Sequence, residues 1–241
     1  MIFTKSRLTK TRSPAHSFDI LVEKRRISPM VMTAPTHSQS AILSNISWQT
    51  FETILAEMGD NRATRLAYDH GTLEIMTPLM PHEHNKRLIE KLIDNLAEEL
   101  NLNLKSTGSV TCKRQDLSRG VEPDSSFYIQ NEPVMRHKQN LDLSQDPPPD
   151  LVIEVDYTSA SVDRLQIYLA LGVPEVWRYD EPVMQIYQLR DAVYVPCDVS
   201  PTFANLPLTT EIPHFLQESL QIGEISMIRS FRDWLKQQKA N

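Results

Sequence analysis

Residues 150–156 constrain the fold of this chain more than any other segment. They read Asp-Leu-Val-Ile-Glu-Val-Asp and follow three consecutive prolines. Successive side chains of a strand point to opposite faces. One face of a strand here would carry Leu151, Ile153 and Val155. The other would carry Asp150, Val152, Glu154 and Asp156. We therefore predict a β-strand with an apolar core face and three carboxylates on its opposite face.

Clustered carboxylates on a partly buried strand favour a bound cation. Unpaired buried charges are costly, and crowding raises their proton affinity. Glu122 and Asp124 lie at the start of a second predicted strand, 124–129. If the two strands pair, about 4.8 Å apart, Asp124 and Glu154 can share one Mg²⁺ or Mn²⁺ ion. The alternative is a solvent-facing strand that carries polar groups on its wet side.

The remaining patterns predict a mixed α/β fold. Apolar spacing predicts helices at 48–58, 82–100, 161–171, 212–220 and 224–238. Strands are predicted at 65–68, 72–76, 103–106, 109–113, 124–129, 150–156, 174–179, 184–189 and 192–196. Strands between 103 and 129 have no crossover helix and should be antiparallel. The helix at 161–171 should link two parallel strands in a right-handed crossover.

Charge and composition divide the chain into three regions. Residues 1–40 hold seven basic and two acidic side chains, net +5, and we expect a disordered leader. The whole chain is −6, so residues 41–241 carry −11. We expect one folded domain over 41–200 and a C-terminal helical extension over 201–241 packed on it. An acidic body argues against broad, salt-dependent affinity for duplex DNA.

Localisation follows from what the sequence lacks. No apolar run approaches the roughly 20 residues of a membrane span, and no secretory signal is recognisable. The only two cysteines, Cys112 and Cys197, form no zinc-binding pattern. We expect a cytoplasmic protein that does not enter a membrane.

Several motifs together resemble a known family. They are Glu122-Pro123-Asp124, residues 148–155, Tyr168, residues 172–177, and residues 71–78 with His82. This set is similar to the Uma family of restriction endonucleases, which is common in cyanobacteria and belongs to the PD-(D/E)XK nuclease superfamily. The similarity extends from about residue 47 to 194. It implies a restriction-endonuclease-like α/β core, a mixed β-sheet flanked by helices, and metal-dependent hydrolysis of DNA.

The resemblance also implies a set of site residues. Asp124 and Glu154 would bind Mg²⁺ (or Mn²⁺), and the backbone carbonyl of Val155 would complete the ligands. A glutamate from the first core helix often assists, and Glu83 is the nearest match. Glu83 has an alternative role as an acid that the helix dipole favours near the N-terminus.

One position departs from the superfamily pattern. A lysine usually stands two residues after the glutamate, where this chain has Asp156. In the Uma family the basic residue often lies in the next helix, and here it is Arg164. An arginine can hold phosphate but is a poor proton acceptor. Lys113 is another candidate cation, unless it is a solvated lysine at a strand end.

Other conspicuous residues have simpler expected roles. His82 and His84 do not share a helix face, so a zinc-protease motif is not supported, and we expect capping or surface roles. Tyr168 and Trp177 are expected to pack in the core.

Three functions remain open from the sequence. The first is a Mg²⁺-dependent deoxyribonuclease, which would have DNA as its partner and would be compatible with a homodimer. The second is a catalytically silent module that binds nucleic acid or a protein. The third is a hydrolase acting on small phosphoesters.

Overall fold

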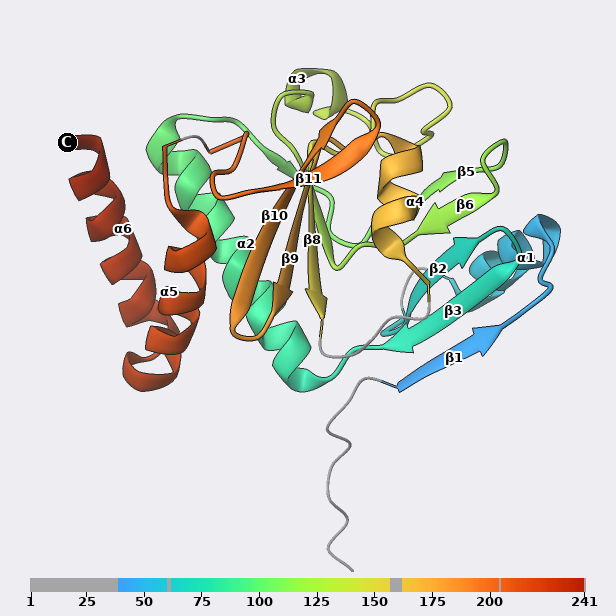
Figure 1. Cartoon of the computed structure of the whole chain (residues 1–241), viewed down its shortest axis with the longest axis horizontal. Helices are drawn as coiled ribbons and strands as arrows, with labels where there is room; N and C mark the ends of the chain where they lie inside the picture. The colour runs from blue at the N-terminus through green and yellow to red at the C-terminus, as the bar shows by residue number, and fades with distance from the viewer. Residues whose placement is uncertain (1–38, 60–61, 157–161, 204, 241) are drawn as a thin grey trace, which may run out of the picture. The chain divides into compact units, whose positions relative to one another are not determined.

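The computed structural model describes residues 39–59, 62–156, 162–203 and 205–240 (Figure 1). The leader predicted for residues 1–40 lies outside these residues except for its last two. Those two begin β1 (Gln39–Leu43), a strand that the sequence patterns did not predict. The described residues form an α/β structure with two β-sheets flanked by helices, which confirms the predicted fold class.

The first sheet is antiparallel and has five strands. In spatial order these are β1, β3 (Thr72–Thr77), β2 (Arg65–Asp69), β6 (Arg119–Val121) and β5 (Cys112–Arg114). The β2–β3 hairpin was predicted from its turn, where His70 and Gly71 have positive φ of 45° and 93°. α1 (Trp48–Met58) covers this sheet and begins at Ser47, whose hydroxyl accepts the Thr50 N–H at 3.1 Å.

The second sheet is mixed and has six strands. In spatial order these are β11 (Val193–Cys197), β10 (Val183–Arg190), β9 (Glu175–Asp180), β8 (Leu151–Asp156), β7 (Ser125–Tyr128) and β4 (Lys105–Ser106). β8 and β9 are parallel, as the sequence predicted, and all other neighbours in this sheet are antiparallel. α4 (Arg164–Leu171) makes the crossover and ends at Gly172, which has a left-handed φ of 78°.

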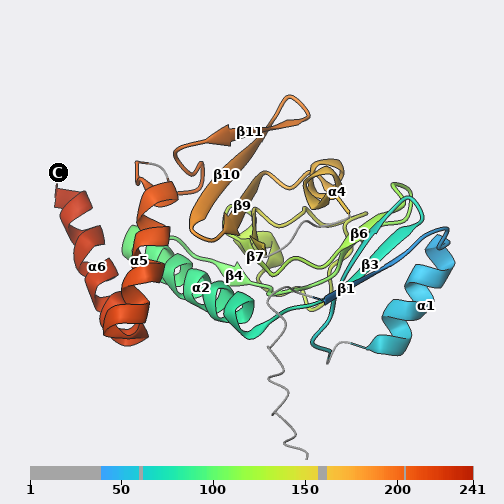
Figure 2. The same cartoon turned by 60° about the horizontal axis from the view of Figure 1, so that its bottom comes forward.

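Helices cover both faces of the second sheet (Figures 1 and 2). α2 (Met80–Leu100), α5 (Leu208–Ile222) and α6 (Glu224–Ala240) share one apolar core with β8, β9 and β10. α4 packs on the opposite face, in a second core that includes residues of the first sheet. The alternative, that β8 turns its polar face to solvent, is therefore wrong, because Val152 is fully buried on the face that it shares with Glu154.

The C-terminal helices are held to α2 by charge as well as by packing. Lys91 of α2 pairs with Glu224 at 2.5 Å, and Arg232 of α6 pairs with Glu98 at 2.7 Å. Both helices are longer than the periodicity predicted. None of the helices in the described part of the chain is long and apolar enough to cross a membrane.

Candidate active site

Asp124 and Glu154, the carboxylate pair, lie opposite each other at one end of the β7–β8 ladder. Ser125 pairs with Ile153, so the next residues outward on the two strands are Asp124 and Glu154. Their exposed fractions are 0% and 5%. Asp124 Oδ2 accepts the Val155 N–H at 2.8 Å, whereas its Oδ1 is buried without a hydrogen-bond partner among the described residues. The strand register thus brings together the two carboxylates that the sequence singled out.

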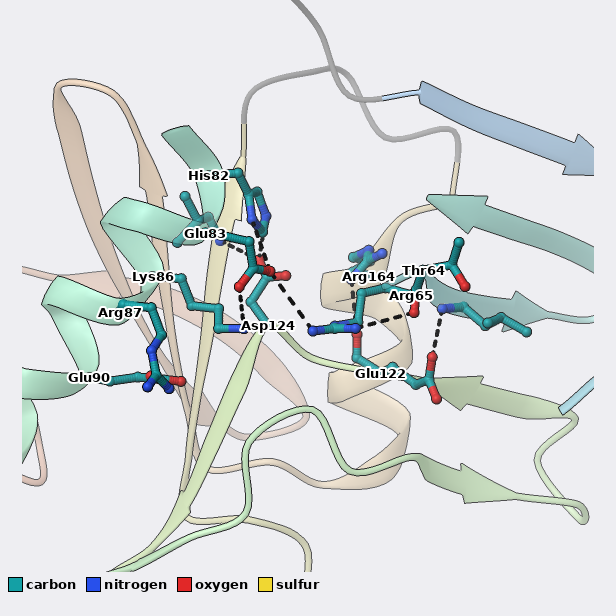
Figure 3. Close-up of polar contacts among 12 residues, drawn as sticks. Thr64, Arg65, His82, Glu83, Lys86, Arg87, Glu90, Glu122, Asp124 and Arg164 are labelled. Atoms are coloured by element: carbon teal, nitrogen blue, oxygen red, sulfur yellow. Dashed lines mark hydrogen bonds and ion pairs between the residues drawn. The ribbon is translucent and has the colours of Figure 1, made fainter. Parts of the chain in front are cut away.

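His82 completes this side of the site, contrary to the capping or surface role expected for it. It projects from the first turn of α2, is 2% exposed, and places Nε2 3.0 Å from Asp124 Oδ2 (Figure 3). Burial alone would lower the pKa of His82, but Asp124 and the nearby Glu154 raise it. Burial would likewise raise the pKa of Asp124, but His82, Arg164 and the Val155 N–H lower it. The pair is therefore favoured as an imidazolium facing a carboxylate.

Arg164 and Tyr168 hold Glu154 from α4. Arg164 Nη1 lies 3.1 Å and 3.3 Å from the two carboxylate oxygens and donates to the Glu122 carbonyl at 3.2 Å. The Tyr168 hydroxyl donates to Glu154 Oε1. The two residues are four positions apart, so one helix face presents both. Burial and Glu154 raise the pKa of Tyr168, which keeps its hydroxyl a donor.

The structure places the remaining predicted residues differently. Glu83 lies at the partly exposed start of α2, where Lys86 approaches it at 3.0 Å and Arg65 at 3.9 Å (Figure 3). The Lys113 ammonium on β5 donates to both carboxylate oxygens of Glu52 at 2.8 Å, and so it is engaged away from the carboxylate pair. The Val155 carbonyl faces the β7 side of β8, because the N–H and C=O of one strand residue point the same way.

Asp150 does not join the carboxylate pair. Its Oδ2 accepts the backbone N–H groups of Ile129 and Asn131 at 2.6 Å and 2.9 Å. Asp150 precedes β8 and stabilises the chain that leaves β7. The side chain of Asp156, at the usual lysine position, lies outside the described residues.

Sequence reasoning missed the polar residues that α2 contributes. Extending its apolar stripe from Ile93 and Ile89 toward the N-terminus reaches Lys86, Asn85 and His82, all of which are buried. Polar residues at core-facing positions of a helix are unusual. That periodicity was the signal that could have identified them.

The donor set of the site fits a hard divalent cation. Two carboxylates and one backbone carbonyl match the oxygen ligands that Mg²⁺ and Mn²⁺ prefer, with water filling other positions, and one carboxylate oxygen, Asp124 Oδ1, has no partner among the described residues. Among the described residues, no group of three or more His, Cys, Asp or Glu side chains is arranged to hold a metal ion. That geometry argues against an all-protein zinc site.

Comparison with known proteins places the chain in a family. Residues 48–222 match the Uma2 family, whose description is "Putative restriction endonuclease". The chain belongs to the Uma2 family. This confirms the resemblance seen in its motifs, and the matched region contains both residues of the carboxylate pair.

A structure and the curated proteins were also compared with this Uma2 member. This chain is similar to a protein from Anabaena variabilis whose crystal structure is described as that of a putative nuclease belonging to DUF820. Identity is 17% and the TM-score is 0.45, over 70% of this chain and 90% of the other. No curated protein matches the sequence significantly.

Proposed function

We propose that this Uma2 protein is a divalent-metal-dependent endonuclease that hydrolyses phosphodiester bonds of DNA. The observation that carries the proposal is the carboxylate pair, in which Asp124 Oδ1 is buried and has no hydrogen-bond partner among the residues that the structure describes. Asp124, Glu154 and the Val155 carbonyl would hold Mg²⁺ or Mn²⁺. When bound, such an ion lowers the pKa of coordinated water and neutralises charge on the phosphate.

The residues around the pair fix the orientation of its oxygens. His82 and the Val155 N–H both contact Asp124 Oδ2, which leaves Oδ1 for a ligand. Tyr168 and Arg164 determine how the Glu154 carboxylate is turned. Because all six of these residues are buried, this geometry is set before a substrate arrives.

Arg164 acts as a positioning residue in this scheme. Burial alone would lower its pKa, but Glu154 and other acidic neighbours raise it, so the guanidinium stays charged. It cannot accept a proton from water. Instead, Arg164 connects α4 to β8 through its contact with Glu154. Its contact with the carbonyl of Glu122 also connects α4 to the segment that precedes Asp124.

Calorimetric titration with Mn²⁺ tests the metal site. We expect saturable binding to the wild type and loss of binding in Asp124→Asn, with Asp150→Asn as a matched carboxylate control outside the pair. Equal binding by wild type and Asp124→Asn would refute the assignment. Cleavage of a mixed DNA panel with Mn²⁺ then tests the reaction, which Glu154→Gln should abolish.

A catalytically silent module is a second candidate, and one observation favours it. Both oxygens of Glu154 are already contacted, by Arg164 and Tyr168, and the usual lysine position holds Asp156. A protein that binds DNA in the absence of metal and leaves the panel uncut with Mn²⁺ would support this candidate over the nuclease.

A further inference from the structure

The lining of a polar cavity of about 540 Å³ includes Glu122, two residues before Asp124 of the carboxylate pair. Four segments line it: the start of β2, the loop that leads into β5 with the β5 residue Lys113, Glu122 after β6, and the loop after α3 (Glu132–Met135). The lining residues are Arg62, Thr64, Arg65, Thr107, Ser109, Val110, Thr111, Lys113, Glu122, Gln139, Asn140 and Leu141. Hydroxyl, amide and cationic groups dominate this set, so the cavity is suited to a polar ligand.

Three buried polar atoms in this lining have no hydrogen-bond partner within the described part of the chain. They are Arg62 Nε, Thr64 Oγ1 and Arg65 Nε. The side chains of Arg62 and Arg65 are only 11% and 12% exposed. Leaving a buried donor unsatisfied costs about 1–3 kcal/mol. Two N–H donors and a hydroxyl of the lining therefore lack a hydrogen-bond acceptor among the described residues.

The charges of the lining indicate that this acceptor is an anion. The Glu122 carboxylate is already occupied by Arg62, Thr111 and the Leu66 N–H. Lys113 is neutralised by Glu52. Arg65 Nη2 lies 3.9 Å from Glu83 Oε1, which is too far for a hydrogen bond. The guanidinium of Arg65 is thus the least compensated charge of the cavity.

Glu122 and Arg65 connect the cavity to the carboxylate pair. The Glu122 side chain lines the cavity, while its carbonyl accepts Arg164, which contacts Glu154. In Figure 3, Arg65 lies between two groups of residues. Glu83 and the His82–Asp124 contact are on one side, and Glu122 and Thr64 are on the other. A ligand in the cavity would therefore lie next to a substrate held at the pair.

We propose that Arg62, Thr64 and Arg65 form a subsite for a phosphate group of the DNA strand, next to the phosphate that is cleaved. Three donors match the several acceptor oxygens of a phosphate, and arginine is suited to bind them. The proposal rests on the proposed function, because it names the strand as the ligand. The subsite would hold the strand in register with the carboxylate pair.

Fluorescence anisotropy with labelled duplex DNA in EDTA tests this assignment without cleavage. We expect Arg65→Gln to weaken binding about tenfold, as loss of a charge-assisted hydrogen bond would. The slope of log K against log salt should fall by about 0.9. Arg65→Lys should recover part of the affinity. Arg232→Gln, which removes an ion-paired arginine on α6, should bind as the wild type does. Unchanged affinity in Arg65→Gln would overturn the assignment to the strand.

A titration with inorganic phosphate separates the subsite from the nuclease activity. The probe is the ¹⁵N–¹H signal of Arg65 Nε, assigned by its absence in Arg65→Gln. We expect it to shift saturably with phosphate, and less in Thr64→Val. A signal that stays unmoved would overturn the subsite. A saturable shift in a protein that neither binds nor cuts DNA would support the phosphate site, but would refute both the strand as its ligand and the proposed function.

Discussion

Replacing Arg164 with methionine should destabilise the protein strongly, because it removes a buried cation from a buried carboxylate. The two side chains are 9% and 6% exposed, and Nη1 lies within 3.3 Å of both Glu154 oxygens. Breaking such a pair from one side typically costs about 3–5 kcal/mol. Methionine retains much of the stem volume, so the loss reports charge more than a cavity. For a chain of this size the melting temperature should fall by roughly 6–20 °C.

Urea unfolding followed by circular dichroism, in EDTA at neutral pH, measures this loss. The double variant Arg164→Met with Glu154→Gln removes both charges and should be more stable than Arg164→Met alone. The double-mutant cycle should give a coupling energy of about 2–3 kcal/mol. A loss below about 1 kcal/mol in the single variant, or strictly additive losses, would refute the argument that the pair is desolvated.

Three further substitutions test the packing, capping and electrostatics of the first sheet. Gly120→Ala would place a Cβ 2.8 Å from the ring of the fully buried Phe51, so the free energy of unfolding should fall by about 1–3 kcal/mol. A melting temperature that calorimetry finds unchanged would contradict this close packing. Ser47→Ala should cost about 1 kcal/mol in urea unfolding through loss of the α1 cap, and an equally stable variant would show that the cap contributes nothing. Burial raises the pKa of Asp69, but Arg119 and His70 outweigh it and lower the pKa below 3.8. The carboxylate thus adds stability above about pH 4 that is lost as the pH falls through its folded pKa. The stability difference from Asp69→Asn should therefore be present at pH 7 and shrink as the pH falls below 3.8, and a difference that stays constant would contradict the shift.

Elements with strong local signals were predictable from the sequence. The β2–β3 hairpin follows from its turn residues, and the parallel β8–β9 pair follows from the intervening helix ended by Gly172. β6 was missed because three residues that include Gly120 have little strand propensity, and pairing on both sides creates the strand. β1 likewise exists through its pairing with β3.

The candidate site was predictable where it depends on strand register. Alternation along β8 and the position of Asp124 identified the carboxylate pair. The spacing of His82 and His84 alone predicts capping or surface roles for His82, whereas the apolar stripe that runs through Ile89 places His82 in the core. The contact of Arg65 with Glu83 joins residues of two different elements, β2 and α2. Such a contact depends on tertiary packing, which local patterns do not encode.

The position of α4 makes the carboxylate pair part of the cooperative core. This helix packs with residues of both sheets, and its Arg164 and Tyr168 contact Glu154 directly. A motion that separates α4 from the two sheets would open the second core and, at the same time, break the packing that joins the two sheets. The orientation of the Glu154 carboxylate consequently depends on the stability of this core, in contrast to sites built on surface loops. Substitutions in the core beneath α4, far from any substrate, would then alter the site by changing how often the whole unit opens.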